Sequence, residues 1–226
     1  MLYEDARAEI ARTGVMLEIE GLLSTTSGNI SCRVAPDLIA ITPTSIRYGD
    51  IRPEDVVITD LDKNVVDGKR RASSELPFHT TLYKARADIG AVVHTHSPYA
   101  TALAIMRRPI PAIHYNIAAF GVDEIPVVPY ATFGSDELAE NIEAVMKGGT
   151  DGALLANHGA VAVASELQKA AKGAALLEFL ARAYYQTLAL GGGVVLPPEE
   201  IAFVIERYKT AGQPREKAAD LAPVGG

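Results

Sequence analysis

The spacing of apolar and polar positions changes several times along the chain, and each spacing predicts a different element. Short apolar or alternating runs bounded by turn residues predict strands. Apolar residues that recur at steps of three and four predict helices. The predicted strands span residues 30–34, 38–42, 55–60, 65–66, 90–96, 125–129, 152–156 and 160–164. The predicted helices span residues 2–20, 73–86, 98–106, 135–147, 166–190 and 199–210.

The longest periodic pattern lies in residues 166–190, where one apolar stripe predicts a helix packed against the core. The stripe consists of Leu167, Ala170, Ala174, Leu177, Ala181, Tyr184 and Leu188. Hairpin-linked strands alternate with helices in the order of elements. This order predicts an α/β domain with a mostly antiparallel sheet covered by helices. No repeat or linker divides the chain, so we expect one domain over residues 1–212 and a flexible tail over residues 213–226.

Composition and charge restrict the class of partner. The 226 residues are 48% hydrophobic, and the formal net charge is −7, which argues against nucleic acid as a partner. The single cysteine, Cys32, cannot form an internal disulfide, and we interpret it as a small apolar residue of a reducing compartment. Charged residues near Met1 interrupt any signal-peptide core, and no long apolar segment occurs. We therefore expect a cytoplasmic protein with no membrane partner.

Three histidines are the candidate metal ligands. His94 and His96 are two apart at the end of an apolar run, so a strand would direct both imidazoles to the same face. His158 lies in a tight turn between two predicted strands, a position that can direct a side chain into a cleft. Three imidazoles with one replaceable oxygen ligand are typical of a catalytic zinc site. A histidine pair on a strand can also be purely structural, and we interpret His79 and His114 as packing or hydrogen-bonding residues.

Several turns could bind an oxyanion. Ser73-Ser74-Glu75 is typical of a helix N-cap, and its hydroxyl and N–H groups would also suit a phosphate. Glu75 would then stand between the phosphate and the metal. Gly28-Asn29 and Thr42-Pro43-Thr44-Ser45 are further turns with N–H and hydroxyl donors.

Taken in order, these motifs resemble those of a known family. Gly28-Asn29, Thr42-Pro43-Thr44, Ser73-Ser74-Glu75, His94-Thr95-His96 and Asn157-His158-Gly159 are similar to the motif set of class II, zinc-dependent sugar-phosphate aldolases of the fuculose-1-phosphate aldolase type. Residues 110–115 and 125–134 add to the similarity, which extends to about Gly212. The resemblance implies a single three-layer α/β/α domain of the class II aldolase/adducin-like fold. It also implies a homotetramer with active sites between subunits.

The resemblance implies metal-dependent, reversible aldol cleavage of a ketose 1-phosphate to dihydroxyacetone phosphate and an aldehyde. His94, His96 and His158, with Glu75, would hold one divalent metal per subunit, zinc first and manganese or cobalt as alternatives. Glu75 would be the acid/base, and Tyr115 would reach a neighbouring subunit's site as the catalytic base near the C4 hydroxyl. Phe133 would lie near the aldehyde. The phosphate would contact Gly28, Asn29, Thr44, Ser45, Ser73 and Ser74.

Two positions depart from the family pattern. Ser45 stands where glycine is expected, and the family's C-terminal tyrosine falls on Ala211, with Tyr208 three residues out of register. The identity of the aldehyde product therefore stays open. The substrate could be L-fuculose 1-phosphate, or a 5-deoxypentulose or 5-methylthioribulose 1-phosphate.

Three alternative functions are compared with the aldolase. Ribulose-phosphate 4-epimerases share the fold but carry Asp where this chain has Glu75. A non-catalytic, adducin-like module is the second alternative. No lysine lies in a buried strand run, which argues against a Schiff-base aldolase.

Overall fold

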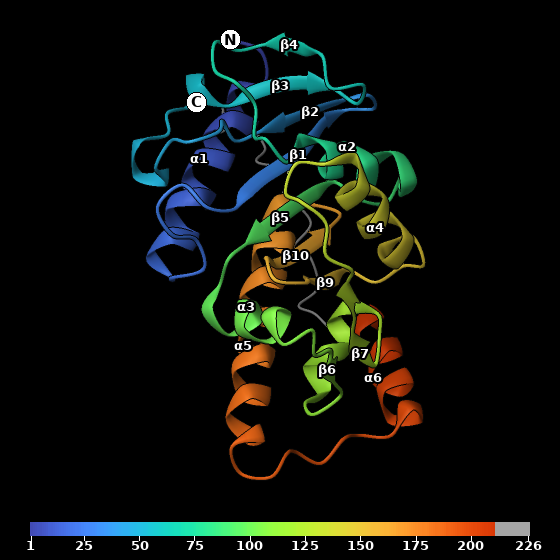
Figure 1. The fold of residues 1–226 in the computed structure, drawn as a ribbon. Coiled ribbons are helices and arrows are strands. Elements are labelled where there is room, and N and C mark those ends of the chain that lie inside the picture. Colours follow the sequence, from blue (N-terminus) through green and yellow to red (C-terminus); the bar gives the residue numbers. More distant parts are fainter. Residues whose placement is uncertain (211–226) are drawn as a thin grey trace, which may run out of the picture.

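The computed structural model describes residues 1–210, in which one large sheet lies between helices (Figure 1). Its eight strands run in the order β4-β3-β2-β1-β5-β10-β9-β8, and all neighbours are antiparallel except β8 and β9. The predicted mostly antiparallel sheet is confirmed. In sheet order, the strands span Val65–Asp67, Val57–Asp60, Leu38–Ile41, Asn29–Ala35, Ala91–Thr95, Gly159–Ala164, Gly152–Leu155 and Val127–Val128.

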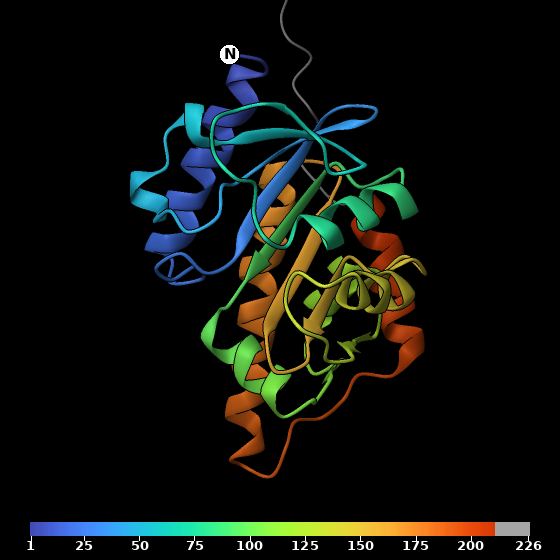
Figure 2. The ribbon, with the colours of Figure 1, turned by 45° about the horizontal axis from the view of Figure 1, so that its top comes forward.

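Helices cover both faces of this sheet and complete the predicted three layers. The first face packs against α1 (Glu4–Ile19) and α5 (Leu167–Leu188), and the opposite face against α2 (Leu76–Ala85) and α4 (Asp136–Met146), as Figure 2 shows. A third apolar cluster joins α3 (Pro98–Ile105) and the C-terminal half of α5 to α6 (Pro198–Thr210). Within residues 1–210, no helix combines the length and apolarity needed to span a bilayer.

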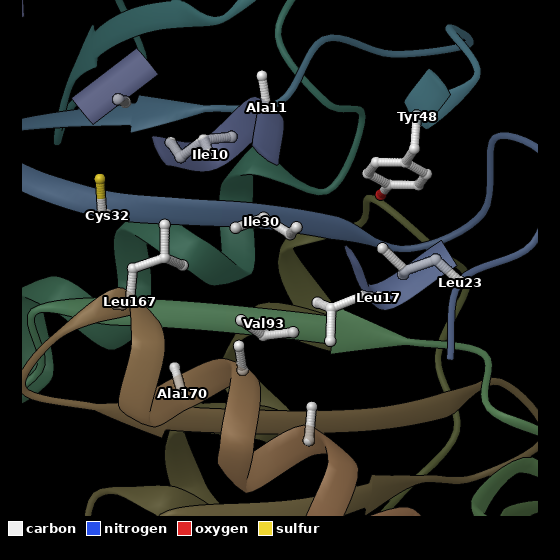
Figure 3. Close-up of a cluster of buried hydrophobic side chains, with 14 of the residues drawn as sticks. Ile10, Ala11, Leu17, Leu23, Ile30, Cys32, Tyr48, Val93, Leu167 and Ala170 are labelled. Atoms are coloured by element: carbon white, nitrogen blue, oxygen red, sulfur yellow. The ribbon is translucent and has the colours of Figure 1, made fainter. Parts of the chain in front are cut away.

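Strand alternation assigns a different chemistry to each face of the sheet. Ile30 and Cys32 of β1 and Val93 of β5 pack with side chains of α1 and α5 (Figure 3). Burial of these apolar groups stabilises the layer at roughly 25 cal/mol per Å² removed from water. The intervening residues Asn29 and Ser31 face α2 instead, where they form hydrogen bonds. The α2 face of β1 is therefore polar at its start.

One predicted strand is wrong in detail. Residues 125–129 do not form one strand, because Pro126 has no N–H to continue a ladder. Glu124–Ile125 (β7) pairs with Ile110–Pro111 (β6) in a separate two-stranded sheet, whereas β8 runs parallel to β9. Neither β6 nor the 3₁₀-helix at Tyr115–Phe120 was predicted, because both are too short to show a period.

The helical ends also differ slightly from the sequence prediction. The helix expected to open at Ser73 begins at Leu76, with Glu75 as the N-cap residue. The long helix predicted for 166–190 spans Leu167–Leu188. Ala211 and the predicted tail lie outside the described residues, so the domain boundary at residue 212 stays a prediction.

Candidate active site

Three histidines from two segments of the chain meet at one point. His94 is on β5, His96 lies just beyond its end, and His158 lies in the turn between β9 and β10. One ligand nitrogen of each lies within 4.8 Å of those of the other two, and the ring centroids are 4.7 to 4.9 Å apart. The structure thus brings together the three residues that the sequence singled out as metal ligands.

The turn that carries His158 is built for close approach to β5. Asn157 has a φ of 55°, and a Cβ at Gly159 would overlap the carbonyl oxygen of Thr95 and lie 3.0 Å from the His96 ring. Only glycine fits where two backbones come this close. The glycine after His158 therefore allows its imidazole to reach the histidines of β5.

Glu75 faces the histidines from the N-terminus of α2. Its Oε2 lies 3.1 Å from His94 Nε2 and accepts a 2.8 Å hydrogen bond from Asn29 Nδ2. Its Oε1 lies 3.4 Å from His158 Nε2, yet it is buried and receives no hydrogen bond from the residues that the structure describes. A buried carboxylate oxygen without a donor is costly, and a cation would satisfy it.

The nitrogen atoms are arranged as ligands of a cation. We assign the Nδ1–H of His94 as donor to the Ala160 carbonyl, 2.9 Å away, so Nε2 presents its lone pair to the cluster. That atom lies 3.0 Å from His96 Nε2. Ligand nitrogens about 2.1 Å from a tetrahedral zinc would be about 3.4 Å apart. Lone pairs that face one another repel unless a positive charge lies between them, so this donor set fits a divalent cation.

Burial and neighbouring charges set the protonation states of the site. Burial lowers the pKa of His96 to about 3 and that of His158 to about 4, and nearby His94 acts in the same direction. Burial opposes ionisation of Glu75 and His94, but their mutual attraction outweighs it, lowering the pKa of Glu75 and raising that of His94. At neutral pH the site therefore holds a carboxylate and neutral imidazoles at His96 and His158, the forms that bind a metal.

A cavity of about 280 Å³ opens beside these histidines. Two surface turns converge at its edge because Ser73 N donates to the Thr42 carbonyl (3.0 Å) and Thr44 N to the Arg71 carbonyl (3.1 Å). The predicted site residues that line the cavity are Gly28, Asn29, Thr44, Ser45, Ser73, Ser74, Glu75, His96, Phe133 and His158. The lining residues that were not among the predicted site residues are Thr26, Ser27, Pro43, Tyr130, Ala131 and Asn157. Ser27, Pro43 and Asn157 are immediate neighbours of predicted residues, and this adjacency is the signal that could have found them.

Two lining residues have left-handed backbone. Gly28 has a φ of 80°, and a Cβ there would lie 2.6 Å from the His94 carbonyl oxygen. Ser45 has a φ of 60°, a conformation that glycine, the residue expected here from the resemblance, adopts without strain. The serine keeps that turn conformation at a cost in backbone strain of about 1–2 kcal/mol.

The two aromatic residues predicted for the site occupy different places. Phe133 lines the cavity and is 65% exposed. Tyr115 begins a 3₁₀-helix outside the cavity, is 53% exposed, and stacks on His114 with ring centroids 4.8 Å apart. Tyr208 donates a 2.9 Å hydrogen bond to Asn116 rather than to the cavity. The cavity of a single chain is therefore built without Tyr115.

Comparison with known proteins identifies the family. Residues 8–185 match the model of the Class II Aldolase and Adducin N-terminal domain. The chain belongs to this family. Since the match spans most of the chain, it covers all three histidines, Glu75 and the turns around the cavity.

The names of similar proteins identify the chain as an aldolase within this family. A 5-deoxy-D-ribulose 1-phosphate aldolase of Bacillus thuringiensis is 40% identical, covering 94% of this chain and all of the relative. A 5-methylthioribulose-1-phosphate/5-deoxyribulose-1-phosphate aldolase of Rhodospirillum rubrum is 42% identical over 85% of this chain and 86% of the relative. The solved structure of an L-fuculose 1-phosphate aldolase superposes with a TM-score of 0.88 at 39% identity, over 92% of this chain and 98% of that one. The predicted fold and enzyme class are confirmed: the chain is a class II aldolase.

Proposed function

We propose that this class II aldolase cleaves a 5-deoxypentulose or 5-methylthioribulose 1-phosphate to dihydroxyacetone phosphate and an aldehyde. The observation that carries the proposal is the junction of three histidines and Glu75 with a cavity lined by hydroxyl-bearing turns. Relatives carry both kinds of name, so the choice of these substrates over L-fuculose 1-phosphate rests on the displaced C-terminal tyrosine.

We assign one divalent cation, zinc in the first place, to His94, His96 and His158, with Glu75 as a replaceable fourth ligand. Manganese or cobalt would suit the same donors. When bound, the cation supplies Lewis-acid stabilisation of the negative charge that develops as the C3–C4 bond breaks.

The phosphate end of the substrate is assigned to the turns at the N-terminus of α2. None of the residues described around this cavity is lysine or arginine. A phosphate there would be held by uncharged donors, which are the hydroxyl and N–H groups of Thr44, Ser45, Ser73 and Ser74 and the backbone of Gly28 and Asn29. The positive end of the α2 dipole would add to their attraction.

The proton transfers fall to two residues. Glu75 lies at the boundary between metal ligands and phosphate turns, where it would protonate the enediolate carbon in cleavage and remove that proton in condensation. Tyr115 would remove the proton of the C4 hydroxyl. Because Tyr115 lies outside the cavity of its own chain, we assign it to the site of a neighbouring subunit in a cytoplasmic homotetramer.

The shared site predicts complementation between inactive variants. Glu75→Gln and Tyr115→Phe chains, each impaired alone, would regain activity when refolded together, because some mixed sites combine the intact Glu75 of a Tyr115→Phe chain with the intact Tyr115 of a neighbouring Glu75→Gln chain. Chromatography with light scattering gives the oligomeric state. A monomer of full activity would overturn the shared site.

The substrate is tested with a panel of ketose 1-phosphates. Purified zinc-loaded enzyme is incubated with 5-deoxyribulose, 5-methylthioribulose, L-fuculose and L-ribulose phosphates, and released dihydroxyacetone phosphate is coupled to NADH oxidation. We expect the highest kcat/KM for the 5-deoxy or 5-methylthio compound, with activity lost on chelation. Epimerised pentulose without triose phosphate would instead identify an epimerase, and full activity after chelation would exclude the metal.

A further inference from the structure

A buried chain of four hydrogen bonds runs from the interior of the protein to Glu75. Tyr83 Oη lies 2.9 Å from Ser31 Oγ, which lies 2.7 Å from His79 Nδ1. His79 Nε2 lies 2.5 Å from Asn29 Oδ1, and Asn29 Nδ2 donates to Glu75 Oε2 over 2.8 Å. All five residues are at most 5% exposed, so water does not compete for these bonds.

The direction of each bond follows from its two ends. Glu75 is ionised and can only accept, so the amide of Asn29 must turn its nitrogen toward Glu75 and its oxygen toward His79. Asn29 Oδ1 can only accept, which makes His79 Nε2 the donor and His79 Nδ1 an acceptor. Ser31 then donates to His79 and accepts from Tyr83. One imidazole tautomer satisfies the whole chain.

Secondary structure places the members of the chain in register. Asn29 and Ser31 are two apart on β1 and project from one face, whereas His79 and Tyr83 are four apart on α2 and project from one side of the helix. Asn29 is also the cross-strand partner of His94 on β5, which sets its amide next to the metal ligands. A strand pair and a helix pair thus interlock directly behind the site.

A merely structural histidine would not need this pattern. His79 is completely buried and stacks on Phe78 at 4.4 Å, so an apolar side chain would fill the same space. Burial lowers its pKa to about 3, so it stays neutral at physiological pH and does not transfer protons. What an apolar side chain could not do is donate a hydrogen bond to Asn29.

We propose that His79 is a positioning residue, which fixes the amide of Asn29 so that its N–H faces Glu75 and holds that carboxylate against the metal ligands. Without the His79 donor, the Asn29 amide could reverse and present its oxygen to the carboxylate, which would push Glu75 out of place. The proposal deepens the proposed function and rests on it for the catalytic consequence. Its consequence for metal binding does not depend on the substrate.

The test compares His79→Leu, which removes the donor, with His79→Gln, whose amide nitrogen can still donate to Asn29. We expect His79→Leu to weaken zinc binding, and to lower kcat of the zinc-saturated enzyme, by about 10- to 100-fold, as is typical when a partner of a metal ligand is lost. His79→Gln should lose clearly less zinc affinity and clearly less kcat than His79→Leu. Leu82→Ala, also buried on α2, is the control for destabilisation, and should lower Tm without changing the zinc dissociation constant.

A double-mutant cycle tests the route through Asn29. In an Asn29→Ala background, His79→Leu should add less than about twofold to the loss of zinc affinity, because the residue through which it acts is gone. Equal losses in both backgrounds would overturn the proposal, as would unchanged zinc affinity in His79→Leu.

Nitrogen-15 NMR of the wild-type histidines should assign a proton to Nε2 of His79. A proton on Nδ1 would also overturn the proposal. If wild type released no triose phosphate from any ketose, the proposed function would fail, while the zinc measurements would still decide the role of His79.

Discussion

Glu75→Gln separates the proton-transfer role of this residue from metal binding. The substitution keeps the shape of the side chain, and its amide oxygen can still accept the 2.8 Å hydrogen bond from Asn29. It removes the negative charge that lies 3.1 Å from His94 Nε2 and 3.4 Å from His158 Nε2, and it removes the only carboxylate among the residues around the cavity that the structure describes. Three imidazoles are left to hold the metal.

The expected loss follows from the role assigned to the carboxylate. A positioned general acid or base contributes about 10²- to 10⁴-fold, which corresponds to about 2.7–5.5 kcal/mol in the activation free energy. Among the residues described around the cavity, no other carboxylate could replace it, so we expect the loss to fall within this range. At saturating zinc, the zinc content should stay at one ion per chain because three nitrogen ligands remain, although loss of the carboxylate should raise the zinc dissociation constant.

The assay requires no knowledge of the aldehyde. Dihydroxyacetone phosphate alone is incubated with enzyme in D₂O, and proton NMR follows the stereospecific exchange of one C3 hydrogen. Elemental analysis of the same samples gives the zinc content. The matched control is Glu140→Gln, the same chemical change at an exposed position on α4.

Two results would refute this reasoning. Exchange within tenfold of wild type, at full zinc content, would remove Glu75 from the proton transfer. Loss of zinc from the variant would show that the carboxylate is required as a ligand, and that three histidines do not suffice. The control variant should behave as wild type in both measurements.

Three further predictions concern the framework of the site. Gly159→Ala places a methyl group against the carbonyl at the end of β5 and should destabilise the fold by about 1–3 kcal/mol in urea titrations while weakening zinc binding; unchanged affinity would contradict the tight fit. Arg7 is 1% exposed, pairs with Asp67 at 2.6 Å and donates hydrogen bonds to backbone carbonyls. Arg7→Met should therefore lower the free energy of unfolding by about 1–3 kcal/mol. The control, Arg12→Met at an exposed position of the same helix, should lower it little. Burial raises the pKa of Cys32 to about 12, so the thiol stays protonated at pH 8. The native enzyme should therefore resist labelling by iodoacetamide, whereas urea-unfolded enzyme should react. Rapid labelling of the native protein would show that Cys32 is not buried.

The metal cluster could be predicted because its determinants are local. Strand alternation sets His94 and His96 on one side, and a tight turn places His158 at the end of a neighbouring strand. The long helix could be predicted for the same reason, because its apolar stripe follows the repeat of the helical backbone. In these cases the short-range pattern in the sequence contains most of the geometry.

The hydrogen-bond chain behind Glu75 could not be predicted in this way. His79 was interpreted only as a packing or hydrogen-bonding residue, since its partners come from a strand some fifty residues earlier. Its contact with Asn29 depends on how α2 settles on β1, which no local period encodes. The split at Pro126 had a local signal in the missing N–H, but the assignment of its two halves to different sheets depends on tertiary pairing.

The division of the site explains how one framework can serve several substrates. The relatives named above act on ketoses that share a phosphate at C1 and differ at the far end of the sugar. In this chain, most of the residues assigned to the shared end are buried or half-buried, whereas Phe133 and Tyr130 at the cavity are 65% and 53% exposed. Differences between substrates would then be recognised at the exposed aromatic end of the cavity, which a neighbouring subunit would complete, while the polar end would bind the part that all the substrates share. Substitutions near the histidines should therefore lower kcat for every ketose in the panel, and substitutions of the exposed aromatics should change the order of preference among them.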